Sequence, residues 1–260
     1  MLSRRTALLA TVAAFSRPAL AQGGRISRLG EAIDMAGAQR MLSQRMGKAW
    51  LGQLRPELAD RARAVLKASE ARFERQLGEL LAYAPTPEIA GSYKAMLHRF
   101  DDYRALLRCA PCRDRVDELL QTSGEMLSLA QMATGQLQSR TREDSARLVN
   151  LSGRQRMLSQ RLALYFLAGQ QGARTEQVRD EMALARAEFD VALETLCAAA
   201  RPVPAIRANL DLARNQWVFL QAALAGESRG PQAADEVFVA SENLLTVMET
   251  VTGQFARQLG

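Results

Sequence analysis

The feature that most constrains this chain is a repeated stretch of seven residues. Residues 39–45, Gln-Arg-Met-Leu-Ser-Gln-Arg, recur unchanged at 155–161. A glycine lies two residues before each copy, at Gly37 and Gly153, which sets an offset of 116 residues between the copies. Self-similarity at a fixed offset indicates a duplicated structural unit, which decides how the rest of the chain is interpreted.

The similarity continues beyond this motif. The triplet Thr-Gly-Gln at 134–136 returns at 252–254, after two inserted residues. We therefore expect two diverged copies of one domain, at residues 25–140 and 141–260, each of ordinary small-domain size.

Prolines and glycines divide each half into four segments, because proline cannot continue a helix interior. The segments are rich in strong helix formers, and their apolar residues recur at helical spacing. We predict an all-α chain of two tandem four-helix bundles. The predicted helices span about residues 28–53, 57–83, 88–108, 113–140, 145–168, 174–199, 205–225 and 232–258.

Two connections between the bundles fit the sequence. No proline lies between Arg113 and Ala168, so one long helix can join the bundles end to end, and we favour this connection. Alternatively, the polar run at 139–145 ends the helix, Asp144 or Ser145 caps the next one, and the bundles lie side by side.

The first 21 residues have the pattern of an export signal. Arg4 and Arg5 precede a short apolar run, and small residues at 19–21 suit cleavage after Ala21. We expect a twin-arginine signal peptide at residues 1–21 and a periplasmic mature protein. The alternative is an uncleaved N-terminal anchor, although the apolar run is shorter than the ~20 residues of a membrane span.

The charge of the chain gives little reason to expect a nucleic-acid partner. The formal net charge is +6, and it becomes +3 once Arg4, Arg5 and Arg17 leave with the signal. Nucleic-acid-binding domains need a dense basic face with interleaved aromatic residues, whereas aromatic residues make up 5% of this chain.

Cys109 and Cys112 enclose a short segment, and Cys197 is the third cysteine. A close pair in an oxidising compartment usually forms a disulfide, which we predict for Cys109 and Cys112. A redox or metal role is less favoured, because no strand is expected here and His98 is the only histidine. No nucleophile with its base, histidine or acid pair lies around the motif, so we expect no enzyme, no metal and no cofactor.

On a helical wheel, the motif-bearing helix has an apolar face toward the bundle core and a second face opposite it. Glycine inside a helix costs about 1 kcal/mol relative to alanine, which makes sense where another backbone or a small ligand comes close. The second face holds one arginine, one glutamine and glycines: Gly37, Arg40, Gln44 and Gly47 in the first copy, and Gly153, Arg156 and Gln160 in the second.

Two such faces packed together would bring two arginines close, where their charges repel unless an anion lies between them. A small planar oxyanion fits, since guanidinium offers it parallel N–H donors. The alternative is that Arg40, Arg45 and their counterparts form salt bridges with acidic residues of neighbouring helices.

The motifs resemble a known family. Residues 33–45 and 149–161 look like the N-terminal periplasmic domain of type IV pili methyl-accepting chemotaxis transducers, the PilJ-type domain. They are also similar to the signature box of nitrate/nitrite sensor kinases, where Gly-x-x-Arg-Met-x-Ser-x-Arg binds nitrate at a two-fold helix pair. The resemblance implies that Arg40 and Arg156 are the anion ligands and that Gly37 and Gly153 permit close approach.

Only the helical wheel places Gln44 and Gln160 in this expected site. One departure is Ala38, where the second copy has Arg154, near the core side of the wheel. Either Arg154 pairs with an acid or extends to solvent, or the wheel is inaccurate near the start of the helix. The residues expected to support the site are Met41, Ser43, Arg45, Met157, Ser159 and Arg161.

We therefore expect a periplasmic sensory or binding protein for a small oxyanion, with nitrate or nitrite favoured. Because the sequence shows no kinase or methyl-accepting coiled coil, the protein would pass its state to a membrane sensor, chemoreceptor or transporter. Side-by-side bundles would form the site within one chain, whereas end-to-end bundles would need a homodimer. The alternative function is a helical protein-interaction module without a small ligand.

Overall fold

The computed structural model describes residues 26–173, 175–226 and 232–259, and these residues fold into eight α-helices. The all-α prediction is therefore confirmed. The predicted signal peptide, residues 1–21, lies outside the described residues. The helices are α1 (Leu29–Gly52), α2 (Ala59–Tyr83), α3 (Pro87–Arg108), α4 (Val116–Gln138), α5 (Asp144–Gln170), α6 (Thr175–Ala199), α7 (Pro204–Ala225) and α8 (Ala233–Gln258), with a short 3-10 turn η1 (Arg113–Arg115) before α4.

Local sequence explains where these helices begin and end. Pro87 and Pro204 lie in the first turns of α3 and α7, where the missing N–H costs nothing. The hydroxyl of Thr86 caps α3 by accepting a hydrogen bond from the backbone N–H of Ile89, at 3.3 Å. Gly226 follows α7 with φ of +70°, a left-handed conformation that glycine adopts without strain.

The favoured continuous helix between the two bundles is wrong, because α4 ends at Gln138 and α5 begins at Asp144. In the connecting turn, the hydroxyl of Thr141 accepts a hydrogen bond from the backbone N–H of Glu143, at 3.2 Å. Such local side-chain bonds offer the backbone an alternative to the helix. The N-cap residue, which directly precedes α5, is Glu143, and it makes no side-chain cap, so the expected cap at Asp144 or Ser145 is also wrong.

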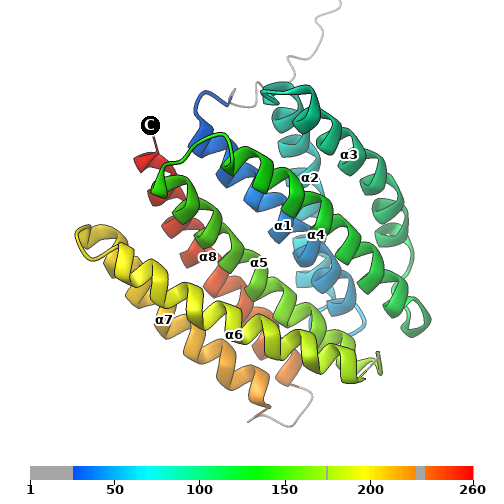
Figure 1. Cartoon of the computed structure of the whole chain (residues 1–260). Helices are drawn as coiled ribbons and strands as arrows, with labels where there is room; N and C mark the ends of the chain where they lie inside the picture. The colour runs from blue at the N-terminus through cyan, green and yellow to red at the C-terminus, as the bar shows by residue number, and fades with distance from the viewer. Residues whose placement is uncertain (1–25, 174, 227–231, 260) are drawn as a thin grey trace, which may run out of the picture.

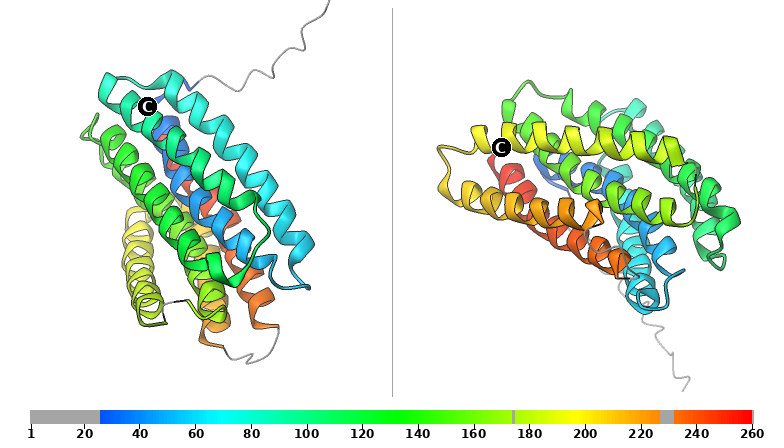
Figure 2. Two further views of the ribbon diagram at one scale, coloured as in Figure 1. Left: turned by 90° about the vertical axis from the view of Figure 1, so that its right-hand side faces the viewer. Right: turned by 90° about the horizontal axis from the view of Figure 1, so that it is seen from below.

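The bundles lie side by side, with α1 and α5 packed together at the centre of the molecule (Figure 1). Helices α2 and α3 flank this pair on one side, and α6 and α7 flank it on the other. Helix α4 packs on α1, while α8 packs on both α5 and α1 (Figure 2). Exchanging the two copies exchanges α1 with α5 and α4 with α8, and both copies share one hydrophobic core.

Helix α1 is buried on nearly all sides, at residues 36–44 and 46–52. Its polar residues must therefore find partners inside the protein. At its first turn, a side-chain carbon on Gly30 would lie 2.6 Å from the carbonyl oxygen of Ala256, so only glycine lets α1 approach the end of α8. Among the described helices, none has both the length and the hydrophobicity required to cross a bilayer.

A buried ion-pair cluster joins α1 to α8. The Nζ of Lys48 is fully buried and lies 2.6 Å from Oε1 of Glu242 and 3.0 Å from the hydroxyl of Ser241. Arg45 pairs with the second oxygen of Glu242. Burial lowers the pKa of Lys48 to about 8. Burial alone would raise the pKa of Glu242, but Lys48 and Arg45 more than offset it and lower that pKa to about 2.

Replacing Glu242 by glutamine is expected to destabilise the protein by about 3–5 kcal/mol near neutral pH, because Lys48 would be left buried without its counter-ion. In the wild type, the carboxylate of Glu242 stabilises the fold above its unfolded pKa of 4.5 and loses this effect as the pH falls toward 2. This loss lowers the unfolding free energy of the wild type by on the order of 3 kcal/mol between neutral pH and pH 2. The Glu242→Gln variant should not show it.

Denaturant unfolding followed by circular dichroism, at about pH 7 and about pH 3, measures both effects. The matched control is Glu194→Gln, because the side chain of Glu194 is 70% exposed and its ion pair with Arg214 is at the surface. Equal stability of Glu242→Gln and Glu194→Gln near neutral pH would contradict the assignment.

Candidate functional site

Two glycines bring the central helices into contact. A side-chain carbon on Gly37 of α1 would lie 3.8 Å from the Cα of Gly153 on α5, and the reverse distance is the same. The close approach expected from the motif is thus present in the structure. Any larger residue at either position would fill the space between the helices.

Arg40 and Arg156 cross this contact in opposite directions. The Nη2 of Arg40 donates to the backbone carbonyl of Asn150 on α5, at 3.1 Å. The Nη2 of Arg156 donates to the backbone carbonyl of Asp34 on α1, at 3.0 Å. Asp34 and Asn150 hold the same place in the two copies, 116 residues apart, so the two arginine contacts are equivalent.

The ends of both guanidinium groups occupy the space that the glycines leave open. A side-chain carbon on Gly37 would lie 3.2 Å from Nη2 of Arg40 and 3.3 Å from Nη2 of Arg156. At Gly153 the distances to Arg156 and Arg40 are the same, 3.2 and 3.3 Å. The structure therefore brings together four of the residues expected from the motif.

The surroundings of the two arginines differ in charge. The Nη2 of Arg156 lies 2.7 Å from Oδ1 of Asp34, which neutralises this guanidinium. At the equivalent place near Arg40, Asn150 carries no charge. The Nη1 of Arg40 donates to Oε1 of Gln131 on α4, at 2.7 Å, and Gln131 is also neutral. The hydrogen-bond partners of Arg40 among the described residues are thus uncharged.

A third arginine lies beside Arg40. Arg154 forms an ion pair with Glu188 of α6, and its Nη1 shares the same oxygen of Gln131 at 3.1 Å. Arg154 therefore pairs with an acid, one of the outcomes expected for it. The counterpart of Arg154 in the first copy is Ala38, so this cation is present on one side of the site only.

Burial and charge both act on Arg40, whose side chain is fully buried. Burial, together with the positive charges of Arg154 and Arg156, lowers its pKa to about 9. Arg40 therefore remains a cation at neutral pH, although no carboxylate in the described part of the chain pairs with it. The Nε atoms of Arg40 and Arg156 are also buried and find no acceptor among the described residues. These donors can hold an anion.

The structure does not bring Gln44 and Gln160 to the arginine pair. The Nε2 of Gln44 donates to the backbone carbonyl of Ser123 on α4, at 3.0 Å. Gln160 does the same to Ser241 on α8, at 2.9 Å. Each amide thus links the motif-bearing helix to the fourth helix of its own copy, a contact that a helical wheel cannot show. We therefore leave them out of the site.

The expected supporting residues fall into two groups. The hydroxyls of Ser43 and Ser159 donate to the carbonyls of the arginine immediately upstream, each at 2.8 Å, and thus lie beside the site. Arg45 and Arg161 form ion pairs with acidic residues of neighbouring helices, as Arg156 does with Asp34, so the salt-bridge interpretation holds for these three arginines. Met41 and Met157 are fully buried in the core.

The predicted disulfide is not formed in this structure, in which Cys109, Cys112 and Cys197 are all free thiols. Cys109 ends α3, and its sulfur points back along the helix to the carbonyl oxygen of Ala105, at 3.4 Å. This orientation turns the sulfur toward α3 instead of along the loop to Cys112.

Three residues of the site were missed in the sequence. Asp34 and Asn150 stand six residues before each arginine, and their equivalence was readable from the repeat. Gln131 comes from α4 and carries no motif, so only the packing of α4 on α1 shows that it reaches Arg40.

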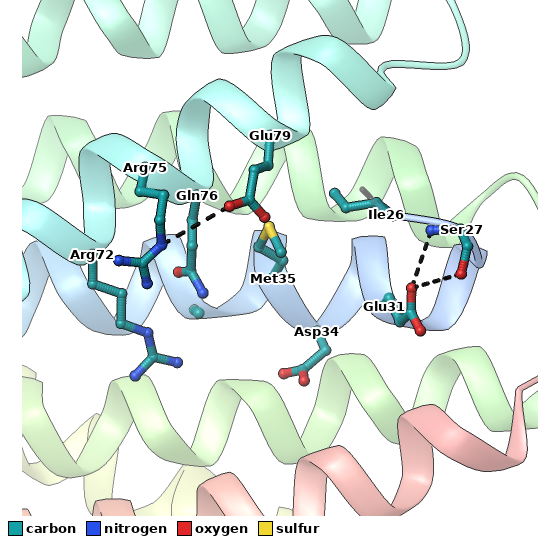
Figure 3. Close-up of a pocket in the computed structure, with 10 residues that line it drawn as sticks. Ile26, Ser27, Glu31, Asp34, Met35, Arg72, Arg75, Gln76 and Glu79 are labelled. Carbon is teal, nitrogen blue, oxygen red and sulfur yellow. Dashed lines mark hydrogen bonds and ion pairs between the residues drawn. The ribbon is translucent and has the colours of Figure 1, made fainter. Parts of the chain in front are cut away.

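A pocket of about 550 Å³ lies between α1 and α2 and reaches Asp34, the partner of Arg156 (Figure 3). Asp34 lines the pocket, and its side chain is 29% exposed there while it pairs with Arg156. The other lining residues are Ile26, Ser27, Glu31, Met35, Ala38, Arg72, Arg75, Gln76 and Glu79.

Comparison with known proteins places the chain in a family. The family model described as type IV pili methyl-accepting chemotaxis transducer N-term (PilJ) matches residues 25–133 and again residues 137–238. A search of curated proteins and a search of solved structures returned no match. The two matches together cover most of the chain, and each contains one arginine of the site. The chain therefore belongs to the PilJ family of chemotaxis transducer N-terminal domains, of which it carries two tandem copies.

Proposed function

We propose that this protein is a periplasmic sensory protein that binds a small oxyanion between Arg40 and Arg156. The observation that carries the proposal is a fully buried arginine, Arg40, whose partners are all neutral. Membership in a transducer family supports a sensory role over a catalytic one.

The first argument for a bound anion is the excess positive charge of the arginine cluster. Burying a cation without a counter-ion is costly, and the usual outcome is pairing with an anion. Three guanidinium groups meet here, those of Arg40, Arg154 and Arg156, whereas two carboxylates pair with them. One positive charge is left over at the centre of the protein, and a bound anion would neutralise it.

The second argument is the arrangement of the guanidinium groups. The guanidinium ends converge over two glycines, and two Nε–H groups point to no acceptor among the described residues. A planar oxyanion accepts parallel N–H bonds of this kind from arginine. Because the guanidinium ends already fill the space over the glycines, the ligand we propose is a small ion such as nitrate or nitrite.

The sensory role needs a membrane partner to receive the signal, and the outer helices offer a surface for one. The most exposed of the large apolar side chains lie on α6 and α7, where Leu184, Val191 and Phe219 are 66%, 70% and 62% exposed. A contiguous surface of such side chains would be typical of a protein-interaction site. The same surface favours the second candidate function, an interaction module that binds a protein partner and no small ligand.

The first test replaces Arg40 by methionine. Because Arg40 is buried without a carboxylate, we expect Arg40→Met to raise the ligand-free unfolding free energy by about 1 kcal/mol or more. The same substitution should remove the thermal shift that nitrate or nitrite causes in the wild type. A protein-interaction module would show no thermal shift with nitrate or nitrite in the wild type.

Thermal unfolding and calorimetric titration with sodium nitrate, sodium nitrite and sodium chloride at equal ionic strength measure both effects. A ligand at about 100 times its dissociation constant stabilises by about 2.7 kcal/mol. The matched control is Arg147→Met, which removes a 55% exposed arginine from α5. Unchanged nitrate affinity in Arg40→Met would refute the site.

The second test adds one methyl group at the helix contact. In Gly37→Ala the new carbon would lie 3.2 and 3.3 Å from the two guanidinium ends, which must shift by a few tenths of an ångström. We expect the variant to fold, because alanine favours the helix by about 1 kcal/mol. Its nitrate affinity should fall about tenfold, equivalent to about 1.4 kcal/mol.

Gly78→Ala is the control for this substitution, since a side-chain carbon at Gly78 of α2 would meet no atom within 4 Å. It should gain helix stability and keep the nitrate affinity of the wild type. Equal affinity in Gly37→Ala and Gly78→Ala, measured by calorimetry, would show that the guanidinium ends at this helix contact do not hold the ligand.

A further inference from the structure

We infer that Asp34 determines which anions the site accepts: by neutralising Arg156 it leaves a single positive charge, so one monovalent anion binds per chain and divalent anions are rejected. This inference rests on the proposed function, because it concerns the same site. It follows from comparing the two copies of the chain position by position.

The two sides of the arginine pair are equivalent in backbone but not in charge. Beside Arg156, the first copy provides Asp34, whose carboxylate lies 2.7 Å from Nη2. Beside Arg40, the second copy provides Asn150 at the matching position, and only its backbone carbonyl accepts a hydrogen bond. At this position a carboxyl in the first copy stands where the second copy has an amide.

Ion pairs on the surrounding helices do not change this difference in charge between the two sides. On the Arg156 side, Arg72 of α2 pairs with Glu249 of α8, which adds no net charge. On the Arg40 side, the position matching Arg72 holds Glu188, which pairs with Arg154. These outer pairs cancel in both copies. The net charge of the site thus depends on two positions: Asp34, which neutralises Arg156, and Asn150, which leaves Arg40 without a carboxylate.

The repeat itself supplies the substitutions that test the inference. Asp34→Asn gives the first copy the amide that the second copy has, and it leaves two uncompensated arginines. We expect its affinity for nitrate to rise by about tenfold or more, and sulfate, which the wild type rejects, to bind. Asn150→Asp gives Arg40 its own carboxylate, and its affinity for nitrate should fall by about tenfold or more.

The experiment titrates wild type, Asp34→Asn and Asn150→Asp with sodium nitrate and sodium sulfate in a calorimeter at equal ionic strength. The control is Asp60→Asn, which makes the same chemical change at a side chain that is 98% exposed on α2. It should bind nitrate and reject sulfate as the wild type does. Ligand-free melting temperatures form a second readout, with Asn150→Asp expected above and Asp34→Asn below the wild type.

The outcomes separate this inference from the proposed function. If neither the wild type nor any variant binds nitrate or nitrite, both the proposed function and this inference are wrong. If the wild type binds nitrate and Arg40→Met does not, but both copy-swapping variants keep wild-type affinity and selectivity, the inference alone is wrong. Should Asp34→Asn not fold, Asn150→Asp still decides, because it adds a counter-ion and its unchanged nitrate affinity would overturn the assignment.

Discussion

The contact between α1 and α5 at Gly37 and Gly153 is the constraint on which the rest of the structure depends. Two backbones that approach this closely leave no room for side chains between them except the ends of the arginines. The flanking helices must then lie on opposite sides of the pair, as α2 and α3 do on one side and α6 and α7 on the other. Both the architecture and the candidate site follow from this one helix crossing.

Helix α1 holds two buried cations, Lys48 and Arg40, whose partners differ in charge. Lys48 has its carboxylate, Glu242, at hydrogen-bond distance, and the pair joins the copies through α8. Arg40 lies two turns earlier on α1 and has amide and carbonyl partners instead. A protein selected for stability alone would favour the first arrangement, because a lone buried charge destabilises the fold. The second arrangement is the observation from which we propose anion binding.

The sequence predicted the helices well because proline, glycine and helix propensity act locally. It failed at residues 139–143, where the break depends on hydrogen bonds between side chains and the nearby backbone that no periodicity reveals. For the site, the repeat identified Arg40, Arg156 and their glycines, since a duplicated motif marks what both copies need. It could not place Gln44 or Gln131, because their roles depend on which face of α4 meets α1, and that is a property of tertiary packing.

The duplication has a consequence for evolution as well as for structure. When two identical chains pair, every substitution appears twice, so their shared site stays symmetric, and its assembly depends on protein concentration. Here the two halves are tethered, which fixes their effective concentration at a value set by the chain itself. Each copy can also change alone, so Asp34 and Asn150 could diverge at equivalent positions. A single chain thereby reaches an asymmetric site that a homodimer cannot encode.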